Sequence, residues 1–160
     1  IIKNKEAIAG RDNDALKHII KKCCKIKAEV VSKDEKEGGL REILNFGHTI
    51  GHAIETKMNF TLLHGECVAL GMKAVFNICL KRGTVSQKEY EELLSLLEYF
   101  NLPLNISGIS SDDIYSQMFL DKKVKNNQLS FVLLESYGKP FSTTNIDKEE
   151  IYSAINAVLR

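Results

Sequence analysis

The chain has 160 residues, of which 44% are hydrophobic, enough to bury a core and fold as one globular domain. Its net charge of +1 gives no electrostatic reason to expect a nucleic acid or an anionic membrane as partner. No apolar run is long enough to span a bilayer, and the first residues lack an initiator methionine and the apolar core of a signal peptide. We therefore expect a cytoplasmic protein, and a chain that is a piece of a longer one.

The first half of the sequence predicts two helices joined by a polar loop. Asp12 or Asn13 can cap a helix whose apolar residues recur at helical spacing as far as about Val31. Residues 32–39 are polar and end in two glycines, which is typical of a loop. The pattern then predicts one continuous helix over about residues 40–58.

The second half predicts further helices and one hairpin. Residues 65–81 are apolar nearly all round, as in a central core helix. Ser86 and Glu89 form a capping box that opens a helix to about Phe100. Further helices are expected over about 111–120 and 147–159, and a two-stranded ribbon over about 128–144. The predicted fold is a mostly α, multi-helical, bundle-like domain with one small β-hairpin.

The cysteine pattern argues against a disulfide framework. The four cysteines form no C-x-x-C pair, and two of them are adjacent on a helical pattern. Reduced thiols in a cytosolic protein are the simpler interpretation. Cys67 follows His64-Gly-Glu, so a cysteine nucleophile is an alternative, although a buried free cysteine is more often a small hydrophobe.

A polar stripe on the predicted helix over 40–58 is the most informative feature of the chain. Its residues follow one another at steps of four, three, four and three, and at about 100° per residue they fall in one narrow band of a helix. A solvated face is usually rich in lysine and glutamate, whereas this one carries an arginine, an amide and two histidines. The stripe is typical of the lining of a polar site. Its members are Arg41, Asn45, His48, His52 and Glu55.

The two histidines of the stripe form an H-x-x-x-H pair, whose imidazoles can share one metal ion. The peptidase version of this motif needs a glutamate after the first histidine, and Thr49 stands there instead. His64 is a plausible further ligand because a new helix begins there. Spacing alone leaves open whether these residues serve a metal, catalysis or a polar subunit interface.

Other charged residues are compatible with an anionic ligand. Arg41 can bind a carboxylate or phosphate with a bidentate fork. Lys27 lies in the first long helix, Glu37 precedes the double glycine, and Lys122 and Lys123 follow a predicted helix. Plain surface charge is an equally good interpretation of Glu37 and, from spacing alone, the better one for the lysine pair.

Two segments together resemble the 3-dehydroquinate synthase family. Residues 27–55 run from Lys27 through the stripe, and residues 64–72 read HGECVALGM. The resemblance covers essentially the whole chain, but only the C-terminal helical domain of that family. Its N-terminal Rossmann-like domain, which holds NAD, is expected to be absent here, because no glycine-rich phosphate loop follows a strand. The chain therefore has no expected cofactor-binding residue for NAD.

The resemblance implies a reaction and its cofactors. The family converts 3-deoxy-D-arabino-heptulosonate 7-phosphate into 3-dehydroquinate and phosphate on the shikimate route, with NAD and a metal, zinc or cobalt. By position, His48 and His64 match the two histidine ligands of that metal. His52 matches a catalytic residue instead of a ligand, and the family's glutamate ligand lies before Ile1.

The resemblance also assigns roles to the remaining polar residues. Lys27, Arg41 and Asn45 match residues that hold the substrate carboxylate and phosphate. Lys122 matches a phosphate contact, although Lys123 beside it cannot be separated by pattern. Glu37 matches, like His52, a residue of proton transfer or substrate hydrogen bonding.

The implied partners are a sugar phosphate, the missing N-terminal domain and a second subunit in a full-length homodimer, with no nucleic acid and no membrane. The isolated chain is expected to be inactive. Two alternatives stay open: a related sugar-phosphate cyclase such as 2-deoxy-scyllo-inosose synthase, and a non-catalytic helical interaction domain.

Overall fold

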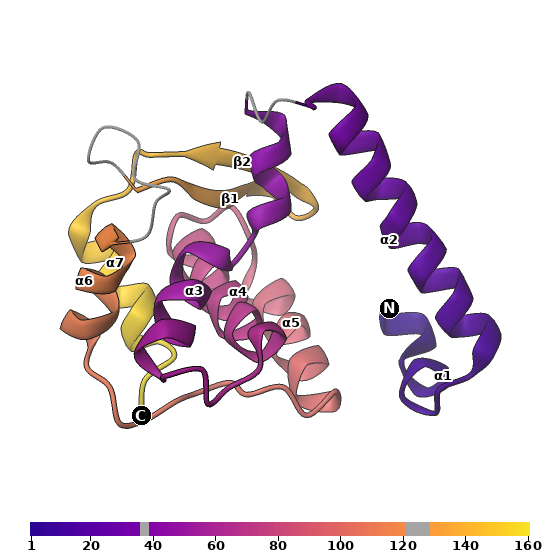
Figure 1. Cartoon of the computed structure of the whole chain (residues 1–160), viewed down its shortest axis with the longest axis horizontal. Helices are drawn as coiled ribbons and strands as arrows, with labels where there is room; N and C mark the ends of the chain where they lie inside the picture. The colour runs from indigo at the N-terminus through magenta and orange to yellow at the C-terminus, as the bar shows by residue number, and fades with distance from the viewer. Residues whose placement is uncertain (36–38, 121–128) are drawn as a thin grey trace. The chain divides into compact units, whose positions relative to one another are not determined.

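The computed structural model describes residues 1–35, 39–120 and 129–160. The chain divides into two compact units, Ile1–Leu44 and Asn45–Arg160. Helices dominate the described residues, whose strands pair in a two-stranded antiparallel sheet, so the predicted fold class is confirmed (Figure 1). Within the described ranges, no helix has both the length and the apolar character needed to cross a bilayer.

The first unit is built around one long helix. The 3-10 helix η1 (Ile2–Asn4) and α1 (Lys5–Ala9) precede α2 (Asn13–Lys33). The Asp12 carboxylate caps α2 by accepting from the backbone N–H of Asp14 at 3.1 Å and of Ala15 at 2.9 Å. The predicted helix and its cap are confirmed, because aspartate at the N-cap satisfies backbone donors that have no partner within the helix.

The predicted continuous helix over 40–58 is wrong. The structure has a 3-10 helix η2 (Leu40–Asn45), a two-residue break, and then α3 (His48–Lys57). Gly47 lies in the break with a left-handed φ of +77°, which disfavours any residue with a Cβ. A Cβ there would also lie 2.7 Å from the backbone nitrogen of Met72 and 2.8 Å from the carbonyl oxygen of Val68. Close backbone packing on the next helix therefore ends the helical run at Gly47.

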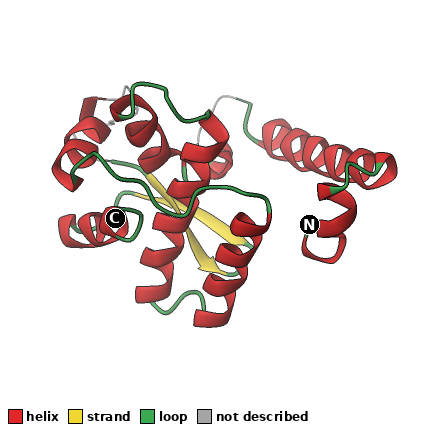
Figure 2. Ribbon diagram, turned by 90° about the horizontal axis from the view of Figure 1, so that it is seen from below, coloured by secondary structure: helices red, strands yellow, loops and turns green. Residues whose placement is uncertain are grey.

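The second unit is organised around α4 (His64–Lys81). This helix packs against α3, α5 (Gln87–Tyr99), α7 (Lys148–Asn156) and the strand β1 (Phe131–Ser136). Figure 2 shows the two strands lying side by side among helices. Most of its side chains are buried, which confirms the predicted core helix. The capping box of α5 is also present as predicted, with Ser86 accepting from the backbone N–H of Glu89.

One charged side chain lies in this apolar helix. Lys73 is only 7% exposed, and its ammonium donates to the carbonyl oxygen of Leu104 at 2.7 Å and to Asn105 Oδ1 at 3.0 Å. Burial lowers the pKa of Lys73, and the nearby Arg160 adds to the effect. The two hydrogen bonds tie α4 to the loop before the last two helices.

The C-terminal part of the unit closes the core. Helix α6 (Ser111–Leu120) packs on α3 and α7. Strand β1 pairs with β2 (Lys139–Thr143) in antiparallel register, with Phe131 opposite Thr143 and Leu134 opposite Pro140. Proline has no N–H to donate, and an edge strand tolerates it. The predicted hairpin is confirmed, apart from residue 128, which lies outside the described residues.

Candidate metal and substrate site

Three histidines from two helices meet in the second unit. His48 and His52 lie one turn apart on α3, and His64 is the first residue of α4. Their ring centroids are 5.2 to 5.6 Å apart. One ring nitrogen from each histidine lies within 4.8 Å of the other two. The structure thus brings together the two histidines of the sequence motif and the third that lay beyond it.

Glycines let the two helices approach closely enough to form this cluster. A Cβ on Gly71 of α4 would lie 1.8 Å from the carbonyl oxygen of Gly47, and a Cβ on Gly51 of α3 would lie 2.8 Å from that of Cys67. The backbones therefore touch without intervening side chains. This close crossing holds the start of α4 beside the polar face of α3.

Two of the histidines have their Nδ1 atoms held by oxygen acceptors. His48 Nδ1 lies 3.1 Å from the carbonyl oxygen of Phe46, and His64 Nδ1 lies 3.1 Å from Glu55 Oε2. A carbonyl or carboxylate oxygen only accepts, so each Nδ1 carries a hydrogen, and in the neutral ring Nε2 then keeps its lone pair. This is the usual arrangement of histidines that bind a metal through Nε2.

The donor set fits a zinc-like ion better than a hard cation. Neutral imidazole nitrogens suit zinc, cobalt and similar transition metals, whereas magnesium and calcium prefer oxygen ligands. Thr49 occupies the position at which a metallopeptidase has its glutamate base. Its hydroxyl donates to the carbonyl oxygen of Ser130 at 2.9 Å and cannot replace that carboxylate. The motif is therefore better suited to a metal site of another kind than to a metallopeptidase.

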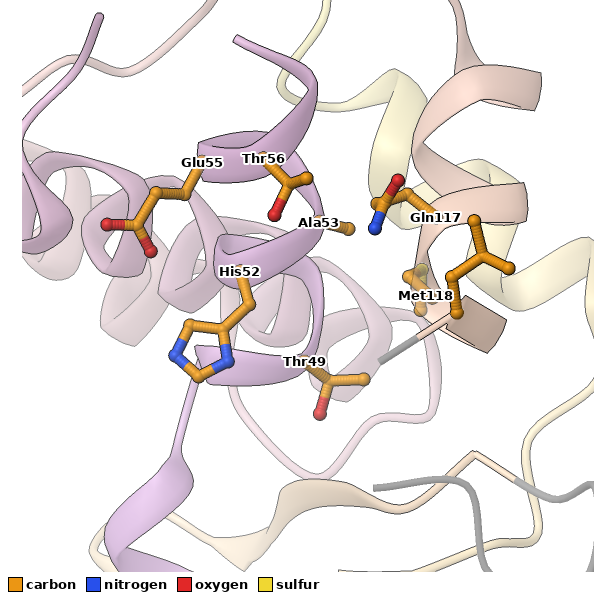
Figure 3. A pocket seen from close by; sticks show the side chains of 8 residues that line it. Thr49, His52, Ala53, Glu55, Thr56, Gln117 and Met118 are labelled. Atoms are coloured by element: carbon orange, nitrogen blue, oxygen red, sulfur yellow. The ribbon is translucent and has the colours of Figure 1, made fainter. Parts of the chain in front are cut away.

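A cavity of about 450 Å³ adjoins the cluster between α3 and α6. Figure 3 shows Ala53 and Thr56 of α3 opposite Gln117 of α6, whereas the His52 ring extends from α3 on the side away from α6. The volume suits a small polar metabolite. Its lining residues are Thr49, His52, Ala53, Glu55, Thr56, Gln117, Met118 and Leu120.

Gln117 and Thr56 are lining residues that sequence reasoning missed. Neither belongs to the polar stripe, and α6 carries no polar periodicity that marks Gln117 as functional. Only the packing of α6 on α3 brings its amide to the cavity.

The remaining predicted site residues lie in other parts of the chain. Asn45 ends η2, three residues before His48. Lys27 is exposed on α2, in the first unit. Glu37 and Lys122 lie outside the described residues.

Arg41 belongs to the first unit and is held locally. Its backbone N–H donates to Asp34 Oδ2 at 2.8 Å, and its guanidinium donates to the carbonyl oxygen of Glu35 at 3.2 Å. Asp34 also accepts from the backbone N–H of Gly39 at 2.9 Å. These bonds fix the start of η2 and the base of the Arg41 side chain.

The cysteines support the interpretation as reduced thiols. All four are free, with Cys67 and Cys79 buried. Burial, followed by the charges of Glu55 and Glu66, raises the pKa of the Cys67 thiol to about 11. A thiol with this pKa is almost entirely protonated at neutral pH, which argues against the alternative of a cysteine nucleophile.

Comparison with known proteins identifies relatives along nearly the whole chain. A family model described as 3-dehydroquinate synthase C-terminal matches residues 1–124. The chain is 46% identical over 156 residues to 3-dehydroquinate synthase of Acetivibrio thermocellus and 45% identical over 148 residues to that of Ruminiclostridium cellulolyticum. These matches cover 98% and 92% of the chain but only 43% and 41% of the relatives, so the chain spans less than half of their length.

Solved structures share the fold. A 2-epi-5-epi-valiolone synthase from Streptomyces hygroscopicus subsp. jinggangensis, with NAD+ and Zn2+ bound, superposes with a TM-score of 0.84 at 19% identity over 97% of this chain and 44% of that one. A 2-deoxy-scyllo-inosose synthase complexed with carbaglucose-6-phosphate, NAD+ and Co2+ superposes with a TM-score of 0.78 at 28% identity, over 89% of this chain and 42% of that one.

Proposed function

The chain belongs to the 3-dehydroquinate synthase family, and from this premise we propose that it supplies the metal- and substrate-binding half of that enzyme's active site. The reaction is the conversion of 3-deoxy-D-arabino-heptulosonate 7-phosphate into 3-dehydroquinate and phosphate. The observation that carries the proposal is the histidine cluster at the crossing of α3 and α4, in a chain 46% identical to a 3-dehydroquinate synthase.

In this proposal His48 and His64 hold a zinc or cobalt ion. The support is the pair of Nδ1 contacts, which make Nε2 the ring nitrogen of each histidine that can bind a metal. The related structures that hold NAD+ contain Zn2+ in one case and Co2+ in the other. The third ligand is a glutamate supplied by another part of the enzyme. When bound, the ion supplies positive charge that polarises and orients a substrate hydroxyl.

His52 has a different proposed role. Its ring lines the 450 Å³ cavity, so it can donate a hydrogen bond to the substrate or accept a proton from it. Glu37 is the second proposed proton-transfer residue. This division leaves two histidines for the metal and keeps the third for the substrate.

The substrate carries a carboxylate and a phosphate, and basic residues of the chain suit both groups. Lys27, Arg41 and Asn45 are the proposed contacts for these anions, with Lys122 on the phosphate. Arginine binds a carboxylate or phosphate through two parallel hydrogen bonds, which fixes its orientation as well as its charge. Binding both ends of the substrate holds the reacting carbons in place, and such positioning lowers the barrier.

Hydride transfer in this proposal needs NAD bound to a separate N-terminal domain. The full enzyme then acts in the cytoplasm as a homodimer, with the site in the cleft between its two domains. The chain alone is expected to release no phosphate above the uncatalysed rate, because NAD is not held against the substrate carbon.

A chimera tests the proposed function. The chain replaces the corresponding part of the Acetivibrio thermocellus enzyme, and phosphate release from 3-deoxy-D-arabino-heptulosonate 7-phosphate is measured with NAD and zinc. We expect turnover that a chelator abolishes and zinc restores. The chimera with His48→Ala is expected to lose both tightly bound zinc and activity. A folded, zinc-loaded chimera without turnover would refute the proposal.

The related cyclases are the second candidate. The chain is 28% identical to 2-deoxy-scyllo-inosose synthase but 46% identical to a 3-dehydroquinate synthase, which favours the latter. The pair of cationic residues, Lys27 and Arg41, also favours a substrate that carries a carboxylate in addition to its phosphate.

A further inference from the structure

Glu55 contacts one of the two proposed metal ligands but has no proposed role of its own in binding metal or substrate. It lies in the last turn of α3, and its Oε2 is 3.1 Å from His64 Nδ1. The Glu55 side chain is 18% exposed, whereas the His64 side chain is 53% exposed. Figure 3 shows the Glu55 side chain extending from α3 on the side away from Gln117. An otherwise half-exposed imidazole is therefore held from one side by a less exposed carboxylate.

The connection between the two helices makes this contact possible. Asn59 and Phe60 both adopt left-handed conformations, with φ of 51° and 57°, and the backbone N–H of Phe60 donates to the carbonyl oxygen of Glu55 at 3.0 Å. The chain thus turns back on the end of α3. At the far end, the backbone N–H of Leu63 donates to Glu66 Oε2 at 2.8 Å, which caps α4. The backbone of His64 is fixed, and only its ring is left to orient.

The carboxylate also selects the tautomer of the ring. Neutral imidazole carries one hydrogen, and the hydrogen bond made by one nitrogen decides the state of the other. Because a carboxylate only accepts, the His64 hydrogen stays on Nδ1 and the Nε2 lone pair is free. The Phe46 carbonyl oxygen, 3.1 Å from His48 Nδ1, likewise places a ring hydrogen of His48 on Nδ1. Of these two acceptors, only the one on Glu55 can be removed by substitution.

We propose that Glu55 is a positioning residue that fixes the ring orientation and the Nδ1–H tautomer of His64, so that Nε2 faces the other two histidines ready for a metal ion. The proposal deepens the metal site of the proposed function and rests on it for its biological purpose. Its structural content, the tautomer of His64, is a property of this chain without metal. A carboxylate in this place also makes a metal-bound imidazole a stronger ligand.

The first test is the tautomer of His64 in the metal-free chain. The ring nitrogens are labelled with ¹⁵N and observed by NMR at about pH 8.5, about two units above the pKa of imidazole in model peptides. We expect Nδ1–H in the wild type and a clear rise of the Nε2–H form in Glu55→Ala. Glu55→Gln should give an intermediate mixture, because its amide can accept from Nδ1–H or donate to a bare Nδ1.

Zinc affinity is the second readout, measured by competition with a chelator. Loss of a carboxylate that supports a ligating histidine weakens binding on the order of 10- to 100-fold. We expect zinc affinity to be highest in the wild type, lower in Glu55→Gln and lowest in Glu55→Ala. A side chain that only fills space would give Glu55→Gln the wild-type affinity, because the two side chains have nearly the same shape.

Glu66→Gln is the matched control. It removes one charge from the first turn of α4, two residues from His64, but its amide oxygen can still accept from Leu63. It should leave the His64 tautomer unchanged and the zinc affinity within about threefold. If Glu55→Ala does not fold, Glu55→Gln still decides the matter. A Glu55→Gln chain with the wild-type tautomer and wild-type zinc affinity would overturn the proposal.

The tautomer measurement and the activity of the chimera test the role of Glu55 and the proposed synthase function independently. A wild-type tautomer in folded Glu55→Ala overturns the role of Glu55 and leaves synthase activity in the chimera unaffected. An inactive chimera refutes the proposed function, whereas the tautomer shift in the isolated chain would still show that Glu55 positions His64.

Discussion

Gly71→Ala is the substitution for which the structure predicts the largest effect. The added Cβ would lie 1.8 Å from the carbonyl oxygen of Gly47 and 2.9 Å from the backbone nitrogen of Gly51. Both neighbours are backbone atoms, so no flexible side chain can move aside. A carbon–oxygen contact needs roughly 3.4 Å, so α3 and α4 would have to separate by more than about 1.5 Å.

That separation disrupts the best-buried interface of the second unit. Ile50 and Ile54 of α3 and Leu70 of α4 are completely buried where these helices pack. Overpacking in a core usually costs about 1–3 kcal/mol, and a clash between two backbones belongs at or above the upper end. We expect Gly71→Ala to lower the free energy of unfolding by about 3 kcal/mol or more, measured by urea denaturation followed by circular dichroism.

The same change should weaken the metal site. Metal–ligand distances tolerate only about 0.2 Å, so a shift of α3 against α4 separates His48 from His64. Gly65→Ala is the control, because a Cβ at Gly65 meets nothing within 4 Å. In the first turn of the same helix it should be neutral or stabilising by up to about 1 kcal/mol. A Gly71→Ala chain as stable as Gly65→Ala would refute the close backbone packing of α3 on α4.

Three further outcomes are expected. His48→Ala should abolish tight zinc binding. His52→Ala should change zinc affinity only a few-fold and lower turnover in the chimera. Equal loss of zinc in the two variants would show that His52 is a ligand. Arg82 donates to Glu150 through Nε and Nη2, both at 2.7 Å, and this pairing lowers the pKa of Glu150. Glu150 then contributes stability above its ordinary pKa that is lost as pH falls through the lowered value, so Arg82→Gln should cost about 1 kcal/mol more at pH 7 than in strong acid, where only the bond of Arg82 to the Asn145 carbonyl oxygen is lost. A constant difference across that range would contradict this assignment. Finally, the Cys67 thiol is buried and its pKa is raised to about 11, so it should react with a thiol reagent only as fast as the chain unfolds. The exposed cysteines of α2 should react at once. Rapid labelling of native Cys67 would contradict its burial.

Local signals predicted most of the helices. The Asp12 cap, the Ser86 capping box and the apolar run of α4 each depend on residues close in sequence, and each is present in the structure. The break at Gly47 does not depend on such signals. It results from contact with α4 backbone more than twenty residues later, and no periodicity within 40–58 reveals that contact.

In the site, too, local spacing was predictable and long-range contacts were not. The spacing of His48 and His52 placed both on one face of α3, and the position of His64 near a helix start indicated a third member. The polar stripe included Glu55 without showing that its partner is His64. That pairing depends on the left-handed backbone conformations of Asn59 and Phe60. Neither residue is a glycine, which is the usual sequence signal for such a conformation.

The lining of the cavity is harder to predict from the sequence than the histidine cluster. Gln117 reaches it only because α6 packs on α3, a contact between helices separated by more than fifty residues. Lys73 is a similar case, since a lysine in an apolar helix is expected at its surface, and its acceptors come from Leu104 and Asn105.

The substrate preference of the chimera tests the central claim most directly. We compare kcat/KM for 3-deoxy-D-arabino-heptulosonate 7-phosphate with kcat/KM for glucose 6-phosphate in one preparation of the chimera. Glucose 6-phosphate is chosen because it resembles the carbaglucose-6-phosphate bound to 2-deoxy-scyllo-inosose synthase. A site built to pair with a charged group rejects a substrate that lacks it, by roughly 10³-fold or more. We predict that preference for the carboxylate-bearing substrate, with 3-dehydroquinate as the product. A preference for glucose 6-phosphate would contradict the account.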